Sequence, residues 1–293
     1  NFDDFMKEFS LDKKTALKYI SENFYILLTS IKEKKDNIKD VAKLFNRSED
    51  IIFEMACNKP QLFTADKKRL VDRLEMQMDI LGINTFDEIV NLAQQKNALL
   101  FTTPNRLKYV IDNSSKKMHI SRQEFIEAGC INPQIFFLEP EAILDNMDDI
   151  SEAILLPKEV LIKVALKNPA IFTVPKRIII ENLDGISKLL NLKRGGYPDL
   201  MTAPNSVVQD IFKKRLAEHS DIETCYPEGV RTALDLLIMS PLLFTLRFDL
   251  AESNLENISS QFGINYNMLC NLSKKNPRLL SFLYKEGESW FKN

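Results

Sequence analysis

The chain is poor in the residues from which metal centres and catalytic sites are most often built. It holds two histidines and four cysteines, and no two cysteines form a C-x-x-C pair. Zinc sites need closely spaced Cys or His ligands, so we expect no metal site and no cofactor. Glycine-rich phosphate loops, G-x-S-x-G and H-E-x-x-H are also absent. We therefore expect no enzymatic activity and no small-molecule substrate.

Long apolar runs and a leader sequence are missing as well. No stretch of about 18 apolar residues occurs, and the first residues, NFDDFMKEF, are acidic. We predict that the protein neither spans nor targets a membrane and that it works inside a cell, in the cytoplasm or an organelle matrix. Only 8 of 293 residues are glycine, while 45% are hydrophobic and 27% charged, which is typical of a folded chain made mostly of helices.

What the sequence does contain is a recurring motif, Pro-x-Leu/Ile-Phe-Thr-x-Pro. Seven segments align on one apolar residue, the anchor of the motif, at intervals of 29 to 43 residues. The anchors are Phe63, Phe101, Phe136, Phe172, Met201, Phe244 and Leu280. Such intervals are typical of helical repeats. Because stacked repeats share one continuous core, the motif predicts a single elongated all-α domain.

Each repeat is predicted to contain a first helix, a tight 3₁₀ turn and a second helix. Thr85 with Glu88, and Ser121 with Glu124, have the spacing of capping boxes at the start of a first helix. First helices should end at the Asn-Pro pairs, because proline and the residue before it are unfavourable in a helix. These pairs begin at Asn132, Asn168 and Asn276.

The second helix is predicted to begin at the second proline of the motif, where a missing amide is tolerated. These prolines are Pro104, Pro140, Pro175 and Pro204. Gly82 and Gly263 have the positions of helix-ending glycines. Cys57 and Cys130 occupy equivalent places in first helices, so we interpret them as buried, reduced thiols of an intracellular protein.

The domain organisation follows from where the motif occurs. Residues 1–47 lack it but show helical patterns, which predicts an N-terminal helical cap. Residues 48–293 are predicted to form a curved α-solenoid of about six to seven two-helix repeats. The segment TCYPEG, Thr224 to Gly229, predicts a loop in one irregular repeat.

This pattern resembles the repeat of the mitochondrial transcription termination factor (mTERF) family, two helices with a 3₁₀ turn and a Pro-x-Leu/Ile signature. The closest stretch is VALKNPAIFTVPKRIIIENLDGISKLLNL, Val164 to Leu192, and the similarity covers roughly Val41 to Leu283. The resemblance implies a curved solenoid that binds duplex DNA or structured RNA along a basic inner groove. It also implies a role in the regulation of transcription or translation.

The charge of the chain departs from that family. The formal charge is −2, whereas a groove that follows phosphates should be cationic. Lys and Arg exceed Asp and Glu by 3 from Cys57 to Ile120 and by 5 from Leu166 to Ala217. Between them, from Ser121 to Ala165, Asp and Glu are in excess by 6. These blocks predict interrupted positive patches and no continuous basic stripe.

Basic residues nevertheless recur near the start of the second helices. Cations are slightly unfavourable at a helix N-terminus, so a row of phosphate sites would explain them. The alternative is that they are surface residues, some paired with Asp66 or Glu181. The candidates are Lys67, Lys68, Arg69, Arg106, Lys108, Lys176 and Arg177, together with Lys213, Lys214 and Arg215, which lie later in their helix.

Two functions are open at this point. The first is nucleic-acid binding, with DNA or RNA as the partner, and the alternative is a scaffold that grips a partner protein. The acidic run of Asp145, Asp148, Asp149 and Glu152 is interpreted as a solvated helix face. We expect a monomer in either case.

Overall fold

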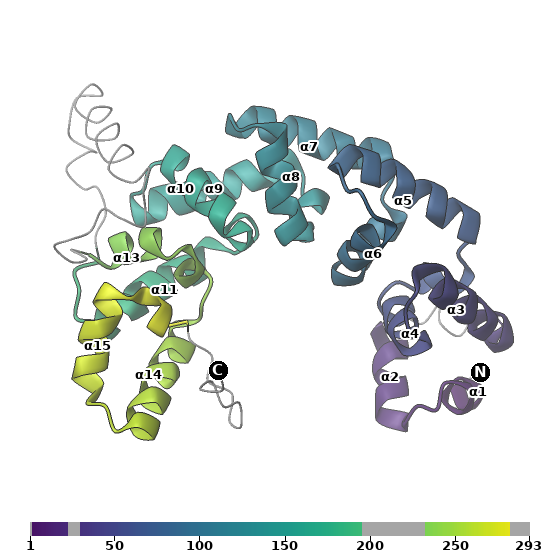
Figure 1. Cartoon of the computed structure of the whole chain (residues 1–293), viewed down its shortest axis with the longest axis horizontal. Helices are drawn as coiled ribbons and strands as arrows, with labels where there is room; N and C mark the ends of the chain where they lie inside the picture. The colour runs from purple at the N-terminus through teal and green to yellow at the C-terminus, as the bar shows by residue number, and fades with distance from the viewer. Residues whose placement is uncertain (1, 23–29, 195–231, 282–293) are drawn as a thin grey trace. The chain divides into compact units, whose positions relative to one another are not determined.

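The computed structural model describes residues 2–22, 30–194 and 232–281, and these residues are almost entirely helical (Figure 1). They contain fourteen α-helices and six 3₁₀ helices, with one isolated β-bridge between Lys193 and Thr232. The prediction of an all-α helical-repeat fold is confirmed. Within these ranges, no helix combines the length and the apolar character needed to cross a membrane.

The chain divides into two compact units, Asn1–Asn113 and Ser114–Asn293, which are described separately. The predicted boundary at residue 47 falls inside the first unit. The first unit contains α1 (Phe2–Glu8), α2 (Lys13–Glu22), α3 (Ile31–Phe45), α4 (Glu49–Asn58), η2 (Pro60–Thr64), α5 (Lys67–Leu81), α6 (Phe86–Gln95), η3 (Asn97–Phe101) and most of α7 (Pro104–Met118).

The second unit begins with the last turn of α7. It then contains α8 (Arg122–Ile131), η4 (Pro133–Phe137), α9 (Pro140–Ile154), α10 (Lys158–Lys167), η5 (Pro169–Phe172), α11 (Lys176–Leu189), α13 (Ala233–Met239), η7 (Pro241–Phe244), α14 (Phe248–Phe262), α15 (Tyr266–Lys275) and η8 (Pro277–Leu279).

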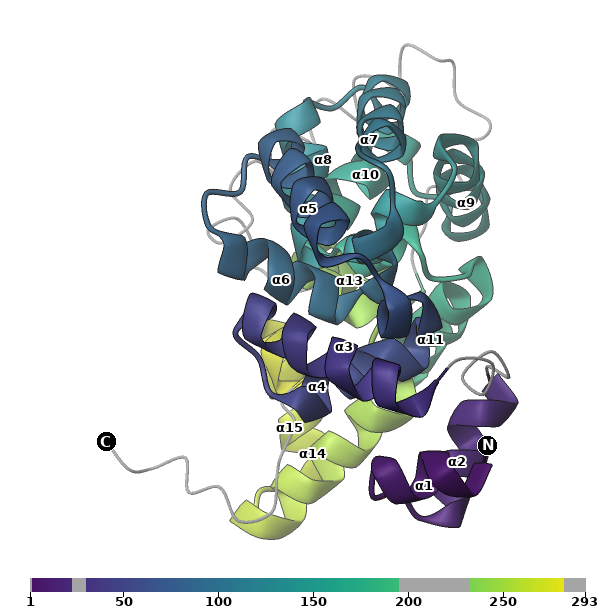
Figure 2. The same ribbon diagram turned by 90° about the vertical axis from the view of Figure 1, so that its right-hand side faces the viewer.

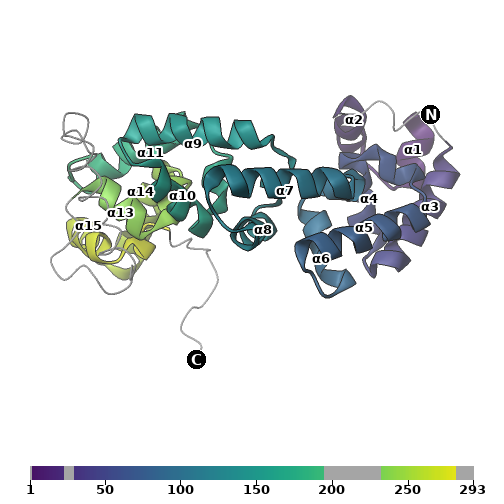
Figure 3. The same ribbon diagram turned by 90° about the horizontal axis from the view of Figure 1, so that it is seen from above.

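The predicted order of first helix, 3₁₀ turn and second helix is confirmed. First helices are α4, α6, α8, α10, α13 and α15, and second helices are α5, α7, α9, α11 and α14. Several first helices pack along the second helix that precedes them: α6 on α5 (Figures 1 and 3), α10 on α9, α13 on α11, and α15 on α14 (Figures 1 and 2). The helix α3 has the length and the C-terminal conformation of a second helix, so the repeat pattern begins within the predicted cap.

The spacing between the two helices of a repeat is constant. From the residue that caps the end of a first helix, such as Lys59 or Asn168, the second helix starts eight residues later. The anchor lies four residues after the cap, at Phe63, Leu100, Phe136, Phe172, Phe244 and Leu280, each at most 1% exposed. The predicted anchor Phe101 is therefore wrong by one residue, because Asn97 takes the place of the proline in that copy. Met201 and Pro204 lie outside the described residues.

A side chain at the seventh position of α3, α5, α9, α11 and α14 holds the 3₁₀ turn of the next repeat, whereas the seventh residue of α7 is the apolar Val110. Asn182 Nδ2 donates to the Phe244 carbonyl oxygen at 2.8 Å, and Asn254 Nδ2 to the Leu280 carbonyl oxygen at 3.0 Å. These carbonyls end short turns and lack a helical partner, so the bond satisfies a group that would otherwise be buried unpaired. Asn37, Arg73, Asn146, Asn182 and Asn254 make this contact, and we call them the latch residues.

A second set of bonds joins the end of a first helix to the 3₁₀ turn of the next repeat. Asn132 Nδ2 donates to the Pro169 carbonyl oxygen and Thr173 Oγ1, and Asn168 Nδ2 donates to the equivalent Pro241 carbonyl oxygen and Thr245 Oγ1. The repeat built on η7 thus follows the repeat built on η5 directly, although residues 195–231 lie between them in the sequence. The predicted TCYPEG loop is outside the described residues.

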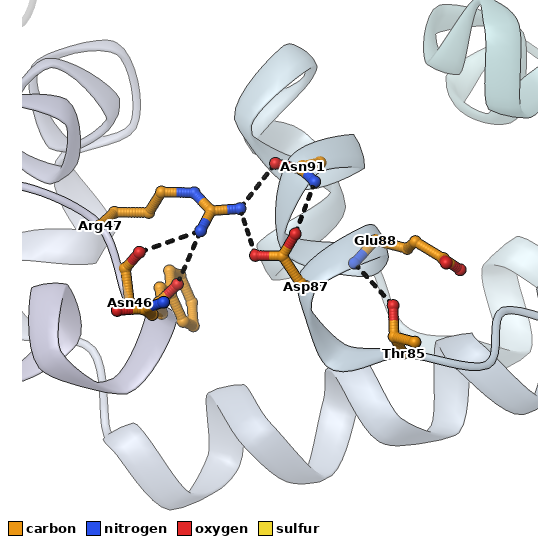
Figure 4. A network of polar contacts seen from close by, with 7 residues as sticks. Asn46, Arg47, Thr85, Asp87, Glu88 and Asn91 are labelled. Atoms are coloured by element: carbon orange, nitrogen blue, oxygen red, sulfur yellow. Dashed lines mark hydrogen bonds and ion pairs between the residues drawn. The ribbon is translucent and has the colours of Figure 1, made fainter.

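The helix ends follow the predicted signals with two exceptions. Ser121 and Glu124 form a complete capping box, and Gly82 and Gly263 end α5 and α14 with left-handed φ angles of 66° and 63°. At Thr85 the box is only half formed. Glu88 N donates to Thr85 Oγ1 at 3.3 Å, but the Glu88 carboxylate points away (Figure 4). Pro104 and Pro140 open their helices as predicted, whereas Pro175 lies one residue before α11.

Candidate nucleic-acid interface

The described candidates lie in the first turns of three second helices. Lys67, Lys68 and Arg69 are the first three residues of α5, and Arg106 and Lys108 the third and fifth of α7, all in the first unit. Lys176 and Arg177 open α11 in the second unit. The cluster Lys213, Lys214 and Arg215 lies outside the described residues.

Two of these lysines make the same contact between consecutive second helices. Lys67 forms an ion pair with Asp40 of α3, and Lys176 Nζ lies 3.4 Å from Asp149 Oδ2 of α9. Asp40 and Asp149 are both the tenth residue of their helix. The hydrogen bond from Lys67 also lowers the pKa of the Asp40 carboxyl. These contacts between helices explain the positive charge of Lys67 and Lys176 without a ligand. The partners are Asp40 and Asp149, and not the predicted Asp66.

The same contact is apolar in α11, whose tenth residue is Gly185. A methyl group at Gly185 would lie 2.5 Å from Cβ of Phe248, the first residue of α14. The contact between the tenth residue of one second helix and the first residue of the next is thus charged in two cases and apolar in a third. Its position is therefore a property of the repeat and does not depend on charge. Arg177 Nε lies 3.5 Å from Glu181 Oε1, which is the predicted partner, although the Arg177 side chain stays 80% exposed.

Lys68, Arg69 and Lys108 differ from these pairs. All three are exposed, and within the described ranges none of their side chains makes a hydrogen bond or ion pair. The fold does not require charge of this sign at these helix starts, because α9 begins with Pro140 and Glu141. Their positive charge is thus available to a ligand.

Arg106 takes part in a contact that sequence reasoning missed. Its guanidinium carbon lies 5.3 Å from the ring centroid of Tyr109, one turn further along α7. Tyr109 is 46% exposed. The spacing of three residues on a helix was the available signal, because side chains at that spacing face each other.

The backbone amides are less available than the predicted row of phosphate sites requires. Asp66 Oδ1 accepts from Arg69 N at 2.8 Å, and Thr103 Oγ1 accepts from Arg106 N at 3.3 Å. In α11 the capping residue is Pro175, which offers no side-chain acceptor. At α5 and α7, positive side chains are therefore the stronger attraction for phosphate.

The acidic run is partly paired. Asp148 binds Lys158 and Asp149 binds Lys176, while Asp145 and Glu152 are exposed. Among the described residues, no three His, Cys, Asp or Glu side chains are grouped so that they could hold a metal ion. Cys57 is buried as predicted, whereas Cys130, also predicted to be buried, is only partly so, and this burial raises the pKa of its thiol. Cys270 is also buried, and His119 ends α7, whereas Cys225 and His219 lie outside the described residues.

One polar network joins the first helix α6 to the end of α3 (Figure 4). Arg47 Nη2 lies 2.7 Å from Asp87 Oδ1 and 2.6 Å from Asn91 Oδ1 of α6. Its Nη1 donates to the carbonyl oxygens of Phe45 and Asn46 at the end of α3. The bond from Arg47 lowers the pKa of Asp87. The arginine therefore caps one helix and orients another, so we assign it to the fold.

A scan of the chain against protein-family models finds no match, and a search of curated proteins finds no similar sequence.

Proposed function

We propose that the protein binds nucleic acid through the exposed basic residues at the starts of α5 and α7. The observation that carries the proposal is the division among the basic residues. Lys67 and Lys176 are used by contacts between helices, whereas Lys68, Arg69 and Lys108 are exposed and unpaired in the described residues. Lysine and arginine that bind no carboxylate are available to displace counterions from phosphates.

The resemblance to the mTERF repeat supports the same class of ligand. We extend the proposal to a distant relationship with that family, in which stacked repeats present successive helix starts to DNA or RNA. The three candidates that are exposed and unpaired in the described part of the chain, Lys68, Arg69 and Lys108, all lie at the starts of α5 and α7 in the first unit. We therefore propose a compact site rather than a long duplex groove.

The test compares two double charge reversals in the full chain, with binding to labelled RNA and DNA followed by fluorescence anisotropy at low and moderate salt. Lys68→Glu with Arg69→Glu should weaken binding at least about tenfold and reduce its salt dependence. The matched control, Lys176→Glu with Arg177→Glu, alters paired residues and should change binding by less than about threefold. Absence of binding at low salt, or equal losses in both variants, would refute the proposal.

A protein-interaction scaffold is the second candidate, and the exposed apolar side chains of the second unit favour it. Phe262, Met268 and Leu272 of α14 and α15 are 51%, 57% and 40% exposed. Exposed apolar groups in such density often mark protein contacts. This candidate predicts that a purified partner protein binds and that nuclease does not disrupt the complex. Met268→Asp should abolish this binding, whereas Lys68→Glu with Arg69→Glu should leave it unchanged.

A further inference from the structure

Tyr109 occupies a surface position of the repeat at which the other second helices carry mainly carboxylates. It is the sixth residue of α7. The sixth residue is Asp36 in α3, Asp72 in α5, Asp145 in α9 and Glu181 in α11, and all four are exposed. The position is therefore solvated in the repeat, and core packing does not explain an aromatic ring there.

Two cationic residues of α7 lie close to Tyr109. Arg106 lies against Tyr109 with its guanidinium carbon 5.3 Å from the ring centroid, and the adjacent Lys108 is exposed. Aromatic and guanidinium planes are the two surfaces on which unstacked bases most often rest, while neighbouring lysines bind the phosphates.

We infer that Tyr109, with Arg106 and Lys108, is a stacking platform for an unpaired base of single-stranded nucleic acid. The inference rests on the proposed function and specifies its ligand. In a duplex both faces of a base are covered by its neighbours, so a ring on the surface of a helix has no base face to contact. A single strand offers such a face, and its short span matches the short basic surface at α5 and α7.

A hydrogen bond from the second half of α5 holds the start of α7, so the length of α5 sets the distance between the two helix starts. Gln77 Nε2 of α5 donates to the carbonyl oxygen of Thr102, two residues before α7. Lys68 and Gln77 are nine residues apart on α5, which corresponds to about 14 Å along the helix axis. A strand that crosses both helix starts therefore spans a few nucleotides.

The experiment uses the full chain and three oligonucleotides of one sequence, as single-stranded RNA, single-stranded DNA and duplex DNA. The single strands contain one 2-aminopurine, whose fluorescence is quenched when it stacks on an aromatic ring. We expect Tyr109→Ala to weaken single-strand binding by about fivefold to a hundredfold and to abolish the quenching. Tyr109→Phe keeps the ring and should retain both. Because Tyr109 makes no phosphate contact, the salt dependence of binding should not change.

The outcomes separate this inference from the proposed function. If Tyr109→Ala binds single strands as tightly as the unaltered protein while Lys68→Glu with Arg69→Glu loses binding, the platform is refuted and the basic surface stands. Preference for the duplex refutes the platform as well. If none of the three oligonucleotides binds at low salt, both proposals fail. Thermal unfolding of Tyr109→Ala should match the unaltered protein, because the side chain is exposed and alanine favours a helix.

Discussion

The second helices α5 and α11 occupy the same place in their repeats but hold the next repeat with different side chains. In α11 the latch residue is the short Asn182, 2% exposed, and the tenth residue is Gly185. In α5 the latch is the long Arg73, assisted by Gln77, and the tenth residue is Met76, 56% exposed. In both repeats the carbonyl oxygen of the anchor residue accepts a hydrogen bond, but the side chain that donates it differs. The comparison indicates that α11 packs more tightly against its successor than α5 does.

The largest expected effect is at the latch of α11. Asn182→Leu removes the donor and leaves the buried Phe244 carbonyl oxygen unpaired, which should lower the free energy of unfolding by about 2 kcal/mol. Arg73→Met in α5 should cost about 1 kcal/mol, because Gln77 still holds η3. Urea unfolding followed by circular dichroism measures both, and equal losses would contradict the comparison.

The tenth residue should give a difference of the same sign and of similar size. Gly185→Ala places a methyl group 2.5 Å from Phe248 Cβ, and the overlap should cost about 1–3 kcal/mol despite the better helix propensity of alanine. Met76→Ala, at the matched position of α5, should change stability by less than about 0.5 kcal/mol. Thermal unfolding of the two variants decides the matter. A stabilising Gly185→Ala would show that α11 has room at this position.

The smallest effect concerns the ion pair that opens α5. Because Lys67 depresses the pKa of Asp40 in the folded protein, the pair stabilises the fold above the unfolded pKa, about 3.9. This contribution is lost as the pH falls through the lower folded value. Between pH 5 and pH 2.5, the free energy of unfolding should therefore fall slightly less for Asp40→Asn than for the unaltered protein. An identical decrease in the free energy of unfolding in both proteins would mean that the ion pair does not stabilise the fold.

Much of the repeat could be predicted from the sequence, because its signals are local. Proline and glycine act on their own backbone, and Ser121 with Glu124 cap a helix across three residues. Ile179 and Leu183, four residues apart in α11, are both buried, as the helical spacing of apolar residues indicates. The register of one copy was wrong because Asn97 replaces the proline that the alignment relied on.

The contacts between repeats could not be predicted, because their partners are far apart in the sequence. Lys67 and Asp40 are separated by 27 residues, and Asn182 and Phe244 by 62. A regular asparagine spacing was visible, since Asn146 and Asn182 are one repeat apart, but it does not say which carbonyl each amide meets. Nor does the sequence show that, among the described residues, Lys67, the first residue of α5, forms an ion pair with another helix while the adjacent Lys68 does not. Nucleic-acid binding and the curvature of the repeats remain predictions.

The bridge between Lys193 and Thr232 brings together two residues that are far apart in the sequence, one after the end of α11 and one before the start of α13. Ala233 N donates to the Lys193 carbonyl oxygen at 2.8 Å, and Leu234 N to that of Arg194 at 3.0 Å. The spacing of the flanking repeats is thereby uncoupled from the number of residues between them. We therefore expect that a change in the number of residues between Arg194 and Thr232 would leave the phase of the repeats on either side unchanged.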